Sequence, residues 1–361
     1  MISNELLTEF QKELVPIMDL QEKLLNIKES DISKIVEIIN EEFTTKISLR
    51  RVLSVLSSLL YARPIYIYLY CQILQFISSK IKPLFDSHEI SSLFENKSAL
   101  LVFLQAKLIT ANSIIQKFDN RQFDINFFFP DIETAKKPKN IKTMQNDEYR
   151  FYGHNEDNIA KIIRNDDVHS LNKALKLDEL LLNSTIHTSR YETFDFVKSF
   201  GKKPSLIEYS AFFGRVNVFR YLLERGAVVS EVLPEFAVCG GSIEIIHSLE
   251  ENKHLTFGAE CLQASVEFFQ YELIEYIIST NNVKYSIFDL LESIKHFNYE
   301  VFIEIIKVGE LCTVDNMNQC LFYSIEYQNI DALNLILKFD GIDVNARTDF
   351  EIIFFIFIIH L

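Results

Sequence analysis

The chain has 361 residues, of which 48% are hydrophobic and 24% are charged, a balance that excludes an intrinsically disordered chain. Its formal net charge of −14 argues against a nucleic-acid partner, because phosphate binding requires concentrated Lys and Arg. The five cysteines are scattered and form no CxxC motif, which indicates reduced thiols and a cytoplasmic location.

Residues 1–130 are predicted to form a helical N-terminal domain. Apolar residues recur there at helical spacing, first after Asp31, which is a suitable N-terminal cap. The longest uncharged run, residues 64–79, approaches the shortest length that spans a membrane, but it contains two glutamines and several tyrosines. We therefore expect a buried core helix in this run in preference to a membrane helix.

The composition becomes polar between residues 131 and 157, where Lys, Asp, Glu and Asn are frequent. A polar stretch of this length favours a linker between two domains. Residues 158–204 resemble a degraded helical unit. We expect them to cap the repeat stack that follows, because the first face of such a stack must be shielded.

A short pattern then recurs five times over residues 205–350. The predicted turns at positions 214, 241, 269, 297 and 328 are 27, 28, 28 and 31 residues apart. A period in this range is typical of helical repeats, in which each unit buries its apolar face against its neighbours. A small residue stands four positions before each turn and is predicted to form the seam between units: Ser210, Ala237, Ser265, Ser293 and Ser324.

A polar or acidic residue also stands three positions after each turn: Asn217, Glu244, Glu272, Glu300 and Asp331. Such residues in the first turn of a helix stabilise the positive end of its dipole. This role is favoured over a row of metal or substrate ligands, because one carboxylate at each helix start needs no ligand. The first unit opens with a predicted capping box of Ser205 and Glu208.

The pattern resembles the ankyrin repeat, most closely in residues 210–227 and in the string Asp-Gly-Ile-Asp-Val-Asn-Ala at 340–346. The whole chain resembles divergent ankyrin-repeat proteins expanded in protozoa, with an ankyrin-associated domain of unknown function and a helical N-terminal region. The resemblance implies an all-α fold, an ankyrin-type helical repeat solenoid with a separate N-terminal helical region. The usual Thr-Pro-Leu-His tetrapeptide is absent and the period is below about 33 residues, so we expect recognition through helix faces rather than hairpin fingers.

In ankyrin arrays, the two variable residues before each turn line the concave face and contact partners. Carried over to this sequence, the candidate partner-binding residues are Phe212, Phe213, Cys239, Glu267, Phe268, Lys295, His296, Glu326 and Tyr327. A mixture of aromatic and charged side chains suits a protein interface. For Phe212, Phe213 and Phe268 the alternative is packing under the N-terminal region.

No motif for catalysis, metal binding or cofactor binding occurs in the sequence. The eight histidines are spread singly, without HExxH or a Cys/His cluster at zinc spacing, and there is no GxGxxG, P-loop or GxSxG. We therefore expect no enzyme activity, no catalytic residue, no metal site and no cofactor.

Together these features predict a non-enzymatic scaffold for a protein partner, with no nucleic acid and no membrane. The alternative is an adaptor that tethers a client to a membrane or to degradation machinery through residues 1–130. Residues 351–361 form an incomplete apolar sixth unit, which predicts either a truncated copy or self-association through the apolar C-terminus.

Overall fold

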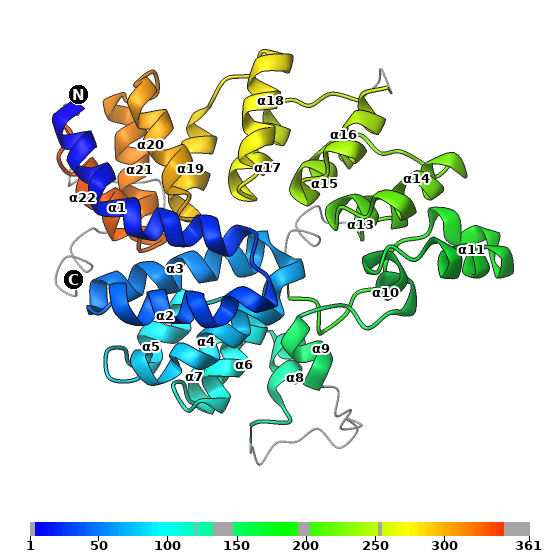
Figure 1. The fold of residues 1–361 in the computed structure, drawn as a ribbon, viewed down its shortest axis with the longest axis horizontal. Helices are drawn as coiled ribbons and strands as arrows, with labels where there is room; N and C mark the ends of the chain where they lie inside the picture. Colours follow the sequence, from blue (N-terminus) through cyan, green and yellow to red (C-terminus); the bar gives the residue numbers. More distant parts are fainter. Residues whose placement is uncertain (1–3, 120, 133–146, 194–202, 252–254, 343–361) are drawn as a thin grey trace. The chain divides into compact units, whose positions relative to one another are not determined.

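The computed structural model describes residues 4–119, 121–132, 147–193, 203–251 and 255–342 (Figure 1). Within these residues the protein is all-α, as the sequence predicts, and the sole β feature is an isolated bridge between Thr185 and Ser205. The predicted apolar unit at 351–361 lies outside the described residues, as does the part of the predicted linker from 133 to 146.

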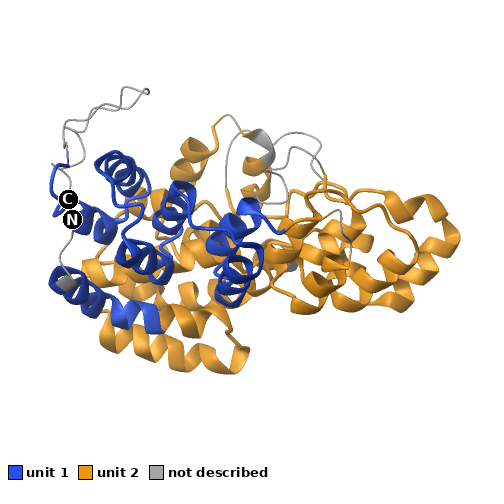
Figure 2. Ribbon diagram, turned by 90° about the horizontal axis from the view of Figure 1, so that it is seen from above, with its two compact units in different colours: residues 1–19, 257–361 blue, residues 20–256 orange. Residues whose placement is uncertain are grey.

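The chain divides into two compact units (Figure 2). Unit 1 comprises Met1–Asp19 and Phe257–Leu361, and unit 2 comprises Leu20–Thr256. This division differs from the predicted domains, because residues 1–19 are grouped with the last part of the repeat region, whereas the rest of the N-terminal region shares unit 2 with its first part. The boundary between the two units falls within the repeat region, between Thr256 and Phe257, and not in the polar stretch at 131–157.

Eight helices form the N-terminal region. They are α1 (Asn4–Leu25), α2 (Ile32–Glu42), α3 (Lys46–Ala62), α4 (Ile67–Ile81), α5 (Ser87–Leu93), α6 (Lys97–Gln105), α7 (Ala111–Lys117) and α8 (Gln122–Phe128). Asp31 precedes α2, but the prediction that it caps this helix is wrong, because its carboxylate accepts instead from the backbone N–H of Lys28. The side chain of Thr45 caps the start of α3. Helix α3 ends at Ala62 because Pro64 disfavours helix in the residue before it. Helix α4 packs against α2, α3 and α6 in the core of unit 2.

Among the described helices, none is by itself long and apolar enough to cross a membrane. Helix α3 and the segment Pro64–Ile81 meet the length and composition criteria only as a pair bent by 112°. The apolar side chains of α4 are buried, as expected for a core helix over residues 64–79: Ile67, Tyr70, Ile73, Leu74 and Ile77.

Pairs of helices joined by a short turn recur after residue 157. In unit 2 they are α10 (Asn158–Arg164) with α11 (Val168–Leu177), α13 (Leu206–Phe212) with α14 (Val216–Glu224), and α15 (Leu233–Gly240) with α16 (Ile243–Glu250). In unit 1 they are α17 (Ala259–Glu267) with α18 (Tyr271–Asn281), α19 (Ile287–Lys295) with α20 (Tyr299–Val308), and α21 (Val314–Glu326) with α22 (Ile330–Ile336). Within each unit, the first helix of one pair packs against the first helix of the next (Figure 1).

All of these described pairs reverse at a residue with left-handed backbone. The φ angles are 54° at Asp166, 63° at Gly214, 67° at Gly241, 52° at Phe269, 54° at Phe297 and 56° at Gln328. A residue in this conformation ends a helix and lets the chain turn back. Five of these residues are the predicted turn positions, and Asp166 lies in the predicted capping unit.

The small residues of the predicted seam are buried, each at most 1% exposed: Ser210, Ala237, Ser265, Ser293 and Ser324. Each serine hydroxyl donates to a carbonyl three or four residues earlier in its own helix, over 2.7 Å in every case. The buried hydroxyls are thereby satisfied without a partner from another helix. The predicted acidic residues at 244, 272, 300 and 331 lie in the first turns of their helices, and the Ser205–Glu208 capping box is present.

The described part of the predicted linker packs into unit 2. Arg150, on α9 (Asp147–Tyr152), is 2% exposed and pairs with Asp131. The backbone carbonyl of Arg150 accepts a hydrogen bond of 2.6 Å from Ser98 of α6, and Asn96 donates to Thr193 over 3.1 Å. The contact of Ser98 holds α9 against the N-terminal helices, and that of Asn96 holds Thr193 of the predicted capping segment against them, which explains the extent of unit 2.

His154, just after α9, is held in its neutral form. Its Nε2 donates to the carbonyl of Pro64 over 3.1 Å, and its ring meets Phe213 edge-on with 6.3 Å between ring centres. Burial lowers the pKa of His154 to about 4, and the charge of Arg164 acts in the same direction. The hydrogen bond to Pro64 opposes this shift without outweighing it.

The stability of the protein is expected to fall as the pH decreases from about 6.5 to about 4, because unfolded His154 takes up its proton before the folded residue does. The stabilisation that neutral His154 gives to the folded state is fully present above about pH 6.5. It is lost progressively down to about pH 4 and does not change below that pH. Since part of the ring is exposed to water, we expect a loss of about 2 kcal/mol. Urea unfolding across this pH range measures it.

The matched control is His154→Gln, whose amide can still donate to the Pro64 carbonyl but does not titrate. As the pH falls, the unchanged protein should lose free energy of unfolding through His154, whereas the variant should not. The variant should therefore gain stability relative to the unchanged protein. An equal pH dependence in both proteins would show that His154 does not titrate differently in the folded state.

Candidate functional site

The ends of α17, α19 and α21 place charged and aromatic side chains at equivalent positions of three successive helix pairs in unit 1. Glu267 is the last residue of α17, His296 follows the last residue of α19, and Tyr327 follows the last residue of α21. Helix α19 packs against both α17 and α21, so its end contacts side chains from each.

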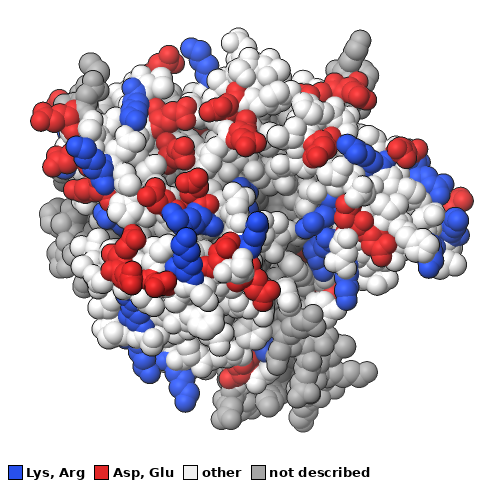
Figure 3. All heavy atoms as spheres, viewed as in Figure 1, with Lys and Arg blue, Asp and Glu red and all other residues white. Residues whose placement is uncertain are grey.

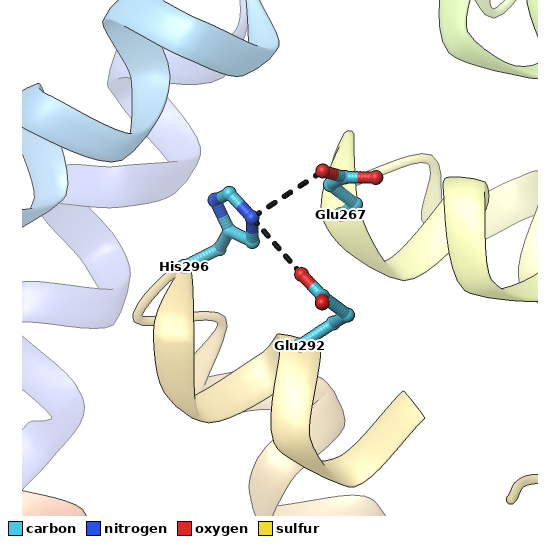
Figure 4. A group of neighbouring side chains, drawn as sticks. All are labelled: Glu267, Glu292 and His296. Atoms are coloured by element: carbon cyan, nitrogen blue, oxygen red, sulfur yellow. Dashed lines mark ion pairs between the residues drawn. The ribbon is translucent and has the colours of Figure 1, made fainter. Parts of the chain in front are cut away.

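His296 lies between two carboxylates (Figure 4). Its Nε2 is 3.2 Å from Oε2 of Glu292 and 3.5 Å from Oε1 of Glu267. Glu292 is four residues before His296 and therefore shares its helix face, whereas Glu267 comes from α17. Both distances exceed the roughly 2.7–2.9 Å of a charge-assisted hydrogen bond, so we describe these contacts as ion pairs.

Lys295 links this group of side chains to α21. Its Nζ is 2.8 Å from Oε2 of Glu292 and 5.9 Å from the centre of the Tyr327 ring, within the range of a cation–π contact. The ring of Tyr327 lies in turn against that of Tyr323, with 5.5 Å between their centres. One connected set of side chains therefore runs across three helix ends.

Opposite charges outweigh burial in setting the protonation of this group. Burial alone would lower the pKa of His296, but the facing carboxylates of Glu267 and Glu292 raise it above its usual value. Burial alone would raise the pKa of Glu292, yet His296 and Lys295 bring it down to about 2. These shifts favour the ionised form of Glu292 and the protonated forms of Lys295 and His296.

The structure brings four of the predicted partner-binding residues together here: Glu267, Lys295, His296 and Tyr327. His296 is buried, while the other three are partly exposed. Glu326, next to Tyr327, is exposed. Without buried His296 and with exposed Glu326, four accessible residues remain, which we call the pre-turn patch: Glu267, Lys295, Glu326 and Tyr327.

The remaining predicted residues are buried: Phe212, Phe213 and Cys239 in unit 2, and Phe268 in unit 1. Phe213 packs against Tyr209, with 4.7 Å between ring centres, and against His154. His154 bonds in turn to Pro64, so Phe213 reaches the N-terminal region through His154, and its burial favours the packing alternative over an interface role. A position before the turn does not by itself leave a side chain accessible, because large apolar groups there turn into the core.

Sequence reasoning missed Glu292 and Tyr323. A signal for both was present, because Glu292 and His296, and likewise Tyr323 and Tyr327, are four residues apart on a helix and so share one face. The contact between Glu267 and His296 had no such signal, since it joins two helix pairs.

Comparison with protein-family models, with curated proteins and with solved structures gave no match. The function is therefore inferred from the geometry of the chain.

Proposed function

We propose that this protein is a non-enzymatic scaffold that holds a protein partner on an ankyrin-type helical repeat stack. The observation that carries the proposal is the recurrence, in each unit, of helix pairs with one turn geometry and one small-residue seam. Stacks of this kind present variable side chains on rigid helices and so form extended binding surfaces.

The pre-turn patch supports a protein as the partner. It combines a tyrosine with both signs of charge, a composition typical of protein interfaces. On the face shown in Figure 3, the Lys and Arg side chains lie among Asp and Glu side chains. Interspersed charge favours a protein partner over a nucleic acid. A nucleic acid carries regular negative charge and therefore requires concentrated basic residues on the protein that binds it.

The test is affinity capture with the full-length chain, in which the double variant Glu326→Lys, Tyr327→Ala is compared with the unchanged protein. We expect the double variant to lose bound partners, because it reverses one charge and removes the aromatic group of the patch. The loss of the Lys295 contact should lower stability by only about 0.5–1 kcal/mol, so the fold should persist in circular dichroism.

Phe288→Ala provides the matched control. Phe288 is 63% exposed and lies near the start of α19, whereas the patch lies at its end. This variant should retain the partners. If the double variant and the control retain the same partners, the patch is not the binding surface.

The alternative proposal, an adaptor that reaches a membrane or degradation machinery through residues 1–130, has less support. A membrane contact would need exposed apolar side chains in the run at 64–79, but those on α4 are largely buried by packing within unit 2. The scaffold proposal needs no such exposed apolar helix.

A further inference from the structure

Three side chains of types that bind metal ions converge where α17 and α19 end. One oxygen from each of Glu267 and Glu292 and one ring nitrogen of His296 all lie within 4.8 Å of one another (Figure 4). We propose that these three residues bind a divalent transition-metal ion of the Zn²⁺ class. The proposal does not rest on the scaffold function, although Glu267 belongs to both sites, and it concerns a site that no sequence motif predicts.

The separations of the two carboxylate oxygens from the ring nitrogen fit the proposed ion. In a tetrahedral zinc site with bonds of about 2.0–2.1 Å, neighbouring donor atoms lie about 3.3–3.4 Å apart. The observed separations from Nε2 of His296 are 3.2 Å and 3.5 Å. They are too long for strong charge-assisted hydrogen bonds but close to the edges of such a tetrahedron.

The chemistry of the donors fits as well. Imidazole nitrogen and carboxylate oxygen are ordinary zinc ligands, and three protein ligands leave a position for water or another donor. With neutral His296, the two carboxylates and Lys295 carry a net charge of −1, which attracts a dication. The ion would occupy the place of the proton on Nε2, so binding releases that proton.

Neighbouring groups hold the ligands in place while leaving an entry path. The side chain of His296 is 8% exposed, whereas those of Glu267 and Glu292 are each 14% exposed, so solvent reaches the carboxylates. Lys295 contacts Oε2 of Glu292 and acts as a positioning residue, because that oxygen retains a second lone pair for the ion. The bound ion would join two successive helix pairs.

The test is titration of the full-length chain, stripped of metal with a chelator, with Zn²⁺ alone. We expect one Zn²⁺ per chain and a rise in the melting temperature, because a ligand that binds only the folded state stabilises it. Affinity should fall at least tenfold in Glu267→Gln and in His296→Gln, which preserve side-chain size. Glu275→Gln, a change at an exposed carboxylate of α18, should leave the affinity unchanged.

Co²⁺ in place of Zn²⁺ identifies the donors by absorption spectroscopy. Nitrogen and oxygen ligands give visible bands without the near-ultraviolet thiolate band that the cysteines would produce. The unchanged protein decides the matter even if a variant fails to fold. Absence of saturable Zn²⁺ binding, a thiolate band, or equal affinity in both ligand variants and the control would each overturn the proposal.

Discussion

Gly240→Ala is expected to destabilise the protein by about 3 kcal/mol. A Cβ atom at this position would stand 2.0 Å from the carbonyl oxygen of Ala211 and 3.0 Å from both the Gly214 nitrogen and the Phe212 oxygen. All three are backbone atoms, which cannot rotate away as a side chain can. The helices α13 and α15 would have to separate, and the contact between their pairs would weaken.

Equilibrium unfolding in urea measures this change, and Gly226→Ala is its control in the same unit. Gly226 has a φ of +82°, but a Cβ there would meet nothing within 4 Å. Its replacement should therefore cost only the backbone strain, about 1–2 kcal/mol. If Gly240→Ala is no more destabilising than Gly226→Ala, the close approach of α13 and α15 is not required.

The two adjacent glycines show what a sequence can and cannot reveal. The repeat pattern predicts a turn at Gly241, and this residue has the left-handed φ of 67° expected where a helix ends. Gly240 serves another purpose, since its missing side chain admits the backbone of α13. Helix ends depend on neighbouring residues in the chain, whereas a close approach depends on a helix nearly thirty residues away.

The same distinction explains the outcome for the repeats and for the candidate site. Turn positions and the small-residue seam were predictable because they recur at a fixed spacing. The burial of Phe268 and the pairing of Glu267 with His296 were not, because each depends on how one helix pair lies against the next. The extent of unit 2 was hidden for a similar reason, since Arg150 looks like a solvated linker residue until Asp131 and Ser98 are placed beside it.

Asn298 couples neighbouring helix pairs through two roles of one side chain. Its Oδ1 accepts a hydrogen bond from the backbone of Val301 and so caps α20, while its Nδ2 donates over 2.9 Å to the carbonyl of Val266 on α17. Asn329 repeats the arrangement, capping α22 and donating over 2.8 Å to Ile294 on α19. In a stack, stability depends on such nearest-neighbour contacts.

Asn298→Asp is therefore expected to destabilise the protein by about 3 kcal/mol, and by more than Asn298→Ala, for which we expect about 2 kcal/mol. Asp caps a helix as well as Asn does, so the cap alone predicts no loss. The carboxylate has no hydrogen to donate, however, and its charge would face the buried carbonyl oxygen of Val266. Urea unfolding at neutral pH measures both variants.

Two further measurements separate the cap from the coupling between pairs. Asp157 caps α10 by accepting from Ile159 and Ala160, so Asp157→Asn should change stability by no more than about 0.5 kcal/mol. The loss in Asn298→Asp should also shrink as the pH falls, because a protonated carboxyl regains a donor for Val266. A loss as small as that of Asp157→Asn would mean that apolar packing alone couples α17 to the pair that follows it.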